Sequence, residues 1–424
     1  MVTARQKTGG LGLLHLAVFG GYAGQQILTP ILPPLARELS ISEFQYGMVM
    51  SASAAVVALV SPLWGRRADA WGRKPLMVIA LFGAALGLAA FAATAHLGLR
   101  GVLGATTVFV LLLLARGILF GGSLAALPVA AQAYVADTSV EEGERIKGIA
   151  RVGAAIGLAL VLGPGLGGLL GDLGMLPALY TAPVLIGLVG VVVWIWLPAE
   201  ERHTDRTAAR GRLSPFDPRI RRFLVSGAGI YLSTSLLQSS IGFLLMDRLD
   251  LTPARTVELS GMVLLAGGLP MLVVQGLIIP KLAWRPQRLL RVGVPLTAGA
   301  FVVICLADSL PVFLAAVTVS GLGHSLAIPG YNSAMSLGVG ANEQGSAAGL
   351  SASVNALTLV LGPLAATSLY QIDPALPFAV GAVVLAALLL LLTRRTPATA
   401  PAQHEGEPTP GDRVAGLTGE SADG

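Results

Sequence analysis

Twelve long apolar segments constrain this chain more than any other feature of its sequence. A helix rises about 1.5 Å per residue, so about 20 apolar residues cross the hydrocarbon core of a bilayer. Continuous runs of this length exclude a closed β-barrel, the other structure that can span a membrane. The sequence therefore predicts an all-α polytopic membrane protein. The segments are 11–35, 44–64, 75–97, 103–136, 148–172, 177–197, 221–246, 257–280, 289–308, 311–337, 345–370 and 375–393.

Composition and charge placement support this class and predict an orientation. Charged residues make up 12% of the 424 residues, whereas a soluble domain carries about 25%. The net charge is +5, and most basic residues lie in short connections on one side, which marks that side as cytoplasmic. An even number of spans then places both termini in the cytoplasm. We expect a multi-pass protein of the inner (plasma) membrane and no nucleic-acid partner, because the basic residues are explained by topology.

The chain repeats itself in two halves. Leu-Val-Leu-Gly-Pro at 160–164 recurs at 359–363, Ser-Leu-Ala at 123–125 recurs at 325–327, and 35–40 resembles 245–250. Three matches in the same order make chance similarity among apolar segments improbable. Many secondary transporters consist of two such repeats around a central site. We predict an N-terminal segment 1–10, a six-helix bundle 11–197, a cytoplasmic linker 198–220, a second pseudo-symmetric six-helix bundle 221–395 and a disordered cytoplasmic tail 396–424.

The connection between the second and third spans carries a distinctive pattern of charges and glycines. We expect a tight turn at the membrane surface, where the glycines permit the reversal. The pattern resembles the signature loop of the major facilitator superfamily, although Ala70 stands where a basic residue is usual. The resemblance implies the twelve-helix major facilitator fold and transport by alternating access. A generic basic loop would explain the cations but not the acidic residue between two glycines. The matching residues are Gly65, Asp69, Gly72, Arg73 and Lys74.

The fifth span carries a second pattern. Gly-Pro-x-x-Gly-Gly at 163–168 resembles a motif of the drug–proton antiporters, the exporter branch of the superfamily. Glycines at such spacing also let helices approach closely, and a proline can bend a helix, so helix packing alone would explain most of the pattern. The residues are Gly153, Gly157, Gly163, Pro164, Gly167 and Gly168.

Arg116 places a charge near the middle of the fourth span. A charge at that depth costs at least about 2.5 kcal/mol on insertion scales, so such residues are by default functional. The segment around Arg116 resembles the superfamily's fourth-helix motif, whose arginine is implicated in proton transfer. An arginine that caps backbone carbonyls within the bundle is the alternative.

Polar residues of several spans are candidates for the substrate cavity. In this superfamily spans one, four, seven and ten line the cavity, so the resemblance implies that their polar side chains contact substrate. Hydrogen bonding between helices is the alternative role for each of them. The candidates are Tyr22, Gln25, Gln26, Arg116, Tyr231, Ser235, Gln238, His324, Tyr331, Asn332 and, in the eleventh span, Asn355.

No span carries a carboxylate near its middle, although antiporters of this family often have one in the first helix. The candidates for proton coupling are therefore Arg116, His324 and His15, since an unperturbed histidine titrates near neutral pH. A structural hydrogen bond is the alternative for each histidine.

The sequence as a whole predicts a secondary active transporter that exports a small organic molecule, a drug or a metabolite, with proton coupling. Facilitated diffusion or import of a small solute is the alternative, and a receptor that does not transport is a more distant one. The sequence has no phosphate-binding loop for ATP, and its spans hold no nucleophile–base pair or metal cluster. We therefore expect no enzyme activity and no cofactor. The expected partners are the small-molecule substrate, protons and the lipid bilayer, and we expect a monomer.

Overall fold

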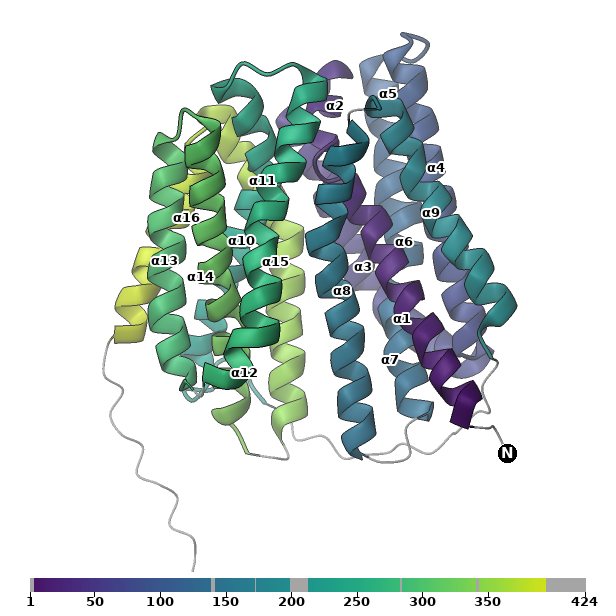
Figure 1. The fold of residues 1–424 in the computed structure, drawn as a ribbon, viewed down its shortest axis with the longest axis vertical. Helices are drawn as coiled ribbons and strands as arrows, with labels where there is room; N and C mark the ends of the chain where they lie inside the picture. Colours follow the sequence, from purple (N-terminus) through teal and green to yellow (C-terminus); the bar gives the residue numbers. More distant parts are fainter. Residues whose placement is uncertain are drawn as a thin grey trace, which may run out of the picture.

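The computed structural model describes residues 4–138, 142–171, 173–198, 213–282, 284–340 and 343–393. All regular structure in these residues is helical, and the long helices run side by side (Figure 1). Ten of the described helices are long and apolar enough to cross a membrane. The predicted all-α polytopic membrane fold is confirmed.

Among the described residues, the first half of the chain contains six long helical segments, one of which is interrupted by a π-helix, η1. Its helices are α1 (Ala4–Ile27), α2 (Leu32–Glu38), α3 (Glu43–Trp71), α4 (Arg73–Leu99), the continuous run of α5 (Ala105–Leu112), η1 (Leu113–Phe120), α6 (Gly121–Leu124) and α7 (Ala126–Thr138), then α8 (Glu142–Gly171) and α9 (Met175–Trp196).

The described part of the second half also contains six long helical segments, and a second π-helix, η2, interrupts one of them. Its helices are α10 (Arg221–Arg248), the run of α11 (Pro253–Val273), η2 (Val274–Ile278) and α12 (Ile279–Leu282), then α13 (Pro286–Leu306), α14 (Leu310–Leu337), α15 (Gln344–Ile372) and α16 (Leu376–Thr393).

Side-chain caps fix where α3 and α11 begin. The Ser42 hydroxyl accepts a hydrogen bond from the Gln45 amide at 3.2 Å, and the Gln45 side chain accepts one from the Ser42 amide at 3.0 Å. This reciprocal pair satisfies two donors that the first turn of a helix leaves free. Thr252 caps α11 with one bond, accepting from the Arg255 amide at 3.4 Å, and Pro253 occupies a first-turn position where no amide donor is required.

The first helix differs from the predicted span 11–35. It begins at Ala4, so residues 4–10 belong to the helix rather than to a separate N-terminal segment, and it ends at Ile27. Pro30 follows within one turn, and a proline removes a helical hydrogen bond and disfavours helix in the residue before it. Helix resumes at Leu32, with Pro33 in the first turn of α2.

The predicted tight turn over 65–74 is wrong. Helix α3 continues through this segment to Trp71, and α4 begins at Arg73. Gly72 alone separates the two helices, with φ +91°, a conformation that side chains rarely adopt. One glycine therefore makes the reversal, while Gly65 lies inside α3. Residues 199–212 of the predicted linker and 394–424, including the predicted tail, lie outside the described residues.

The two ends of the bundle differ in charge. We call the end where α3 meets α4 the basic end, because it carries Arg66, Arg67, Arg73 and Lys74. We call the opposite end, where α2 lies, the far end (Figure 1). The larger apolar core includes residues of both halves near the far end, among them Leu35 of α2 and Phe243 of α10. A smaller core lies within the second half, toward the basic end.

Candidate functional site

Close helix contacts join the two halves toward the far end. Helix α8 packs against α11, and α15 packs against α3. A methyl group built on Gly261 would lie 2.7 Å from the carbonyl oxygen of Pro164, and one built on Gly47 would lie 3.0 Å from that of Pro363. The two prolines occupy corresponding positions in the repeated Gly-Pro sequence, so the same kind of contact is made twice. Only glycine allows the backbones to approach this closely.

A polar network crosses between the halves at the same end. The guanidinium of Arg37, on α2, donates to both carboxylate oxygens of Asp247, on α10, at 3.0 Å each. The Tyr370 hydroxyl donates to Asp247 Oδ2 at 2.6 Å. Glu43, in the same half as Arg37, pairs with it at 2.7 Å. We call Arg37, Asp247 and Tyr370 the far-end latch.

The close glycine contacts between the halves do not continue toward the basic end. Methyl groups built on Gly153 and Gly157 of α8 would meet no atom within 4 Å, and the same holds for Gly345 and Gly349 of α15. These are the two helices that pack tightly against the other half near the far end.

The glycines of the predicted exporter motif fall into two groups, one near the far end and one toward the basic end. Gly163 lies against Gln26 of α1, and Gly167 lies against the carbonyl of Ile27. A methyl group on Gly168 would lie 2.9 Å from the Cα of Gly261. These three glycines permit the close packing that their spacing suggested, whereas Gly153 and Gly157 face open space.

The basic end of the first half is held by an ion pair. Arg73 Nε donates to Asp137 Oδ2 at 2.8 Å, and Arg73 Nη1 donates to the carbonyl of Ala68 at 2.5 Å. Both charged side chains are 12% exposed. This pair ties the start of α4 to the end of α7. The side chain of Asp69 lies outside the described residues.

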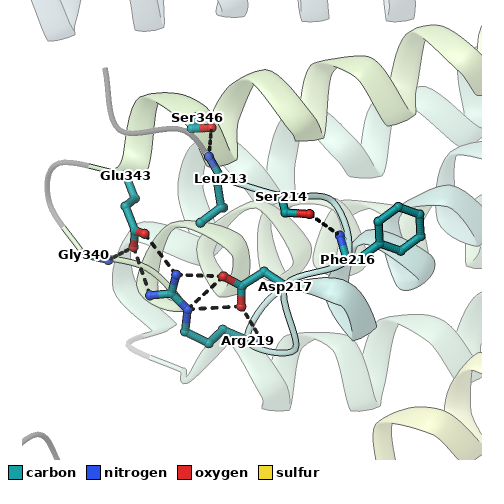
Figure 2. Close-up of polar contacts among 8 residues, drawn as sticks. All are labelled: Leu213, Ser214, Phe216, Asp217, Arg219, Gly340, Glu343 and Ser346. Carbon is teal, nitrogen blue, oxygen red and sulfur yellow. Dashed lines mark hydrogen bonds and ion pairs between the residues drawn. The ribbon is translucent and has the colours of Figure 1, made fainter. Parts of the chain in front are cut away.

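The second half pairs its charges with the linker instead. Arg219 bridges Asp217 and Glu343, with contacts of 2.8 to 3.2 Å to the first and 3.0 Å to the second (Figure 2). The amide of Leu213 donates to Ser346 Oγ at 3.0 Å. The guanidinium of Arg219 lowers the pKa of both carboxyl groups. We call residues 213–220 the docked linker, because these contacts tie it to the basic end of α15.

A polar cavity of about 460 Å³ lies in the second half, toward the basic end. Three predicted cavity residues line it together: Tyr231, Asn332 and Asn355. Amide, hydroxyl and phenol groups provide its polar surface, and none of its lining side chains is charged. The full lining is Tyr231, Asn332, Met335, Ser336, Gln344, Ala348, Ser351, Ala352 and Asn355. An apolar cavity beside Tyr46 has only about 20 Å³, room for one water molecule.

Ser351 is a lining residue that the sequence reasoning missed. Its hydroxyl donates to the Tyr331 hydroxyl at 2.6 Å and lies 3.4 Å from Asn332 Oδ1. Tyr331 itself is fully buried, and its ring lies perpendicular to that of Tyr231 at 5.9 Å between centroids. A signal was available, because Ser351 precedes Asn355 by four residues and so shares its helix face.

The remaining predicted cavity residues lie elsewhere. Ser235 packs against Gly362, on α15. Gln238 and Tyr22 are half-buried, and Tyr22 packs on the larger core. Gln25 Oε1 is buried and has no hydrogen-bond partner among the described residues.

Arg116 lies within the π-helix η1 and is 4% exposed. Its Nε and Nη1 atoms have no hydrogen-bond partner among the described residues. The guanidinium carbon lies 5.0 Å from the centre of the Phe120 ring, a cation–π contact. Single π-helical turns occur frequently at functional sites. The described contacts therefore do not include the carbonyl-capping bonds that a structural role for Arg116 would require.

The two candidate histidines differ in their bonding. His324, on α14, is 6% exposed and hydrogen-bonded at both ring nitrogens. His15 Nε2 is buried without a hydrogen-bond partner among the described residues. Neither histidine lines the polar cavity.

Comparisons with known proteins agree with this architecture. The tetracycline resistance protein of class G from Vibrio anguillarum is 27% identical over 365 residues, covering 82% of this chain and 87% of that protein. Multidrug resistance protein 1 of Bacillus subtilis is 25% identical over 393 residues, covering 92% and 97%.

A solved structure shows the same fold. It is a bacterial homolog of the human lysosomal transporter Spinster in an inward-facing and occupied conformation, with a TM-score of 0.70 and 14% identity, covering 92% of this chain and 97% of that one. The family model for the Major Facilitator Superfamily matches residues 14–363 and 296–418. The chain therefore belongs to the Major Facilitator Superfamily, a family of membrane transporters.

Proposed function

We propose that this protein exports a small organic molecule from the cytoplasm by alternating access. One observation carries the proposal: the halves are in close contact near the far end, and these contacts do not continue toward the basic end, where the polar cavity lies. A transporter with one end closed and the other open presents its site to one side of the membrane. Closing the basic end and opening the far end would present it to the other side.

The basic end is the cytoplasmic side in this proposal. Arg66, Arg67, Arg73 and Lys74 lie there in a short connection between spans, and basic residues in short loops stay on the cytoplasmic side. The structure then has its cavity open to the cytoplasm, as substrate uptake for export requires. Both termini would be cytoplasmic.

Two observations favour export over the alternative, import or facilitated diffusion of a solute. Three relatives that match most of the chain are named for resistance to tetracycline or to multiple drugs, and a fourth is named as a human solute carrier. Pro164 and Gly168 of the exporter-like motif make a contact between the halves near the far end, with Gly261. Substrate in the cavity would meet hydroxyl, phenol and amide groups.

Proton coupling is the proposed energy source. The described spans hold no carboxylate near mid-depth, so the candidates are the buried groups Arg116, His324 and His15. Of these, His324 is hydrogen-bonded at both ring nitrogens, whereas Arg116 and His15 each have buried nitrogens without a partner among the described residues.

The test uses inside-out membrane vesicles that contain the protein, with tetracycline and ethidium as probes. An acid vesicle interior should drive probe accumulation above that of vesicles without the protein, and nigericin, which collapses the gradient, should abolish the difference. Accumulation that ignores the gradient would support a facilitator instead. If neither probe is transported in either direction, in vesicles of either orientation, a wider panel of organic cations and anions is tested. Transport of none of these compounds would refute the exporter proposal.

A further inference from the structure

His324 is surrounded by hydrogen-bonding groups on both sides of its ring. Nε2 lies 3.0 Å from the hydroxyl oxygen of Ser233, on α10. Nδ1 lies 2.9 Å from the carbonyl oxygen of Ser320, one turn earlier in α14, and 3.3 Å from the Ser320 hydroxyl oxygen. Both serines are at most 1% exposed, so water does not compete for these bonds.

The direction of each bond follows from which atoms can donate. The Ser233 hydroxyl donates its one hydrogen to the carbonyl of Ile230 at 2.7 Å. In that orientation its oxygen can only accept, and Nε2 of His324 carries a hydrogen. If the hydroxyl turns to donate to Nε2 instead, Nδ1 carries the hydrogen and donates to the Ser320 carbonyl. A carbonyl oxygen also only accepts, whereas the Ser320 hydroxyl can donate or accept.

The ring is fully bonded in both charge states. In the neutral ring, either Nε2–H donates to Ser233 and Nδ1 accepts from the Ser320 hydroxyl, or Nδ1–H donates to the Ser320 carbonyl and Nε2 accepts from the Ser233 hydroxyl. In the protonated ring, Nε2–H donates to Ser233 and Nδ1–H donates to the Ser320 carbonyl. No side chain has to move when the ring gains a proton, because the hydroxyl and carbonyl oxygens of Ser320 both lie within hydrogen-bonding distance of Nδ1. Buried polar groups left unpaired are costly, and neither state leaves one.

The surroundings of His324 contribute hydroxyl and backbone groups rather than charges. Helix α10 presents Ser233, and α13 presents Thr297, whose hydroxyl donates to the Gly293 carbonyl at 3.0 Å. Helix α11 meets α14 through the backbone of Gly267. Helix α15 contacts α14 nearer the basic end, through the Tyr331 phenol. None of the ion pairs among the described residues includes His324.

We propose that His324, with Ser233 and Ser320 as positioning residues, is the proton-binding site of this transporter, a role that rests on the proposed proton coupling. The site takes the place of a mid-span carboxylate. Ser233 also ties the site to the cavity, because its bond to Ile230 braces the helical turn that carries the lining residue Tyr231. In the protonated ring both nitrogens donate, so Ser233 is then needed as an acceptor.

The two serines should act unequally, and this separates a proton site from a structural histidine. Ser233→Ala removes the acceptor of Nε2–H, which the protonated ring cannot replace by changing tautomer. Ser320→Ala leaves the carbonyl, which both the protonated ring and one neutral tautomer use. The midpoint of His324 titration should fall by about 0.4 to 1 pH unit in the first variant, the range of one hydrogen bond, and change by less than that in the second.

The measurement is the pH titration of the imidazole signals of histidine-labelled protein in lipid nanodiscs by NMR. The chain has five histidines, and His324→Gln assigns the signal. Ser325→Ala is the matched control, because Ser325 is buried beside His324 and donates to the Leu322 carbonyl instead. Its midpoint should equal that of the parent protein.

A lower midpoint in Ser233→Ala, with Ser320→Ala and the control close to the parent protein, supports the site. An unchanged or higher midpoint in Ser233→Ala, or a signal that does not titrate between pH 4 and 9, would overturn it. Transport in the vesicle assay separates the two proposals. If the parent protein responds to the pH gradient and His324→Gln responds equally, the site is wrong and the coupled exporter stands. If the parent protein ignores the gradient, proton coupling itself fails.

Discussion

The far-end latch should set how much of the protein is open at the basic end. Asp247→Asn removes the charge that Arg37 and Tyr370 share, while keeping the size of the side chain. In an alternating-access cycle the latch exists only while the far end is closed. Its loss should therefore shift the population toward the state open at the far end, because an interaction confined to one state stabilises only that state.

The size of the shift follows from the exposure of the pair. A hydrogen bond to a charged group contributes about 1.5–3 kcal/mol when buried, and an exposed ion pair about 0–1 kcal/mol. The side chains of Arg37 and Asp247 are 35% and 30% exposed, which places the loss between these limits, at about 1–2 kcal/mol. Since 1.4 kcal/mol is a factor of ten, the population ratio should change about 5- to 30-fold.

Distances between spin labels at the far end measure this ratio. Val102, in the first half, and Leu306, in the second, are exposed at that end, and the single native cysteine, Cys305, is first replaced by serine. The longer distance should gain population in Asp247→Asn. A distance distribution identical to that of the parent protein would refute the role of the latch.

A matched control and a double-mutant cycle test the reasoning further. Glu43→Gln removes a partner of Arg37 that lies in the same half, so it should change the distribution less than Asp247→Asn. Adding Arg37→Gln to Asp247→Asn should cost little more than either change alone, because the two residues share one interaction. Additive effects would show that the bidentate pair is not the source of the shift.

The remaining predictions concern packing, the buried cation and the docked linker. Gly261→Ala should lower far-end closure and transport at least several-fold, whereas Gly157→Ala, which meets no atom within 4 Å, should transport like the parent protein. Arg116→Ala should abolish vesicle transport at equal expression, and Arg116→Lys should retain part of it, because lysine offers one ammonium group instead of a planar fork. Glu343→Gln should increase hydrogen exchange in the docked linker at neutral pH. Arg219 lowers the pKa of Glu343 in the folded state, so the contribution of this contact is complete above the ordinary carboxyl pKa of 4.5 and is lost as pH falls through the lowered value.

The spans were predictable because each depends only on local hydrophobicity over about 20 residues. The ends of the helices were less predictable than the spans. Nothing in the sequence around 65–74 distinguishes a ten-residue turn from two helices that meet at Gly72, because both place charges at the membrane surface. The end of α1 at Ile27 could have been placed, since Pro30 follows it and proline interrupts helices.

The site required information that the sequence does not contain locally. Tyr231 and Asn332 were found because they are polar residues within apolar spans. The pairing of Arg37 with Asp247 depends on how two halves close on each other, and no local pattern encodes that. The bonds of His324 to Ser233 likewise depend on the rotation of α10 against α14.

The way α1 is held has a consequence for how the protein is made. This helix, with His15 and two glutamines, is not among the ten that are long and apolar enough to cross a membrane by composition. Methyl groups on Gly20 and Gly24 would lie 2.6 Å from Val189 and 2.5 Å from Ile186, both on α9. Helix α8 also packs along α1. The ribosome completes α8 and α9 only after α3 to α7, so α1 waits through much of the synthesis of the first half for the two helices that cover it. Chains truncated before α8 should therefore lose α1 from the bilayer and be degraded, while chains truncated after α9 should keep it.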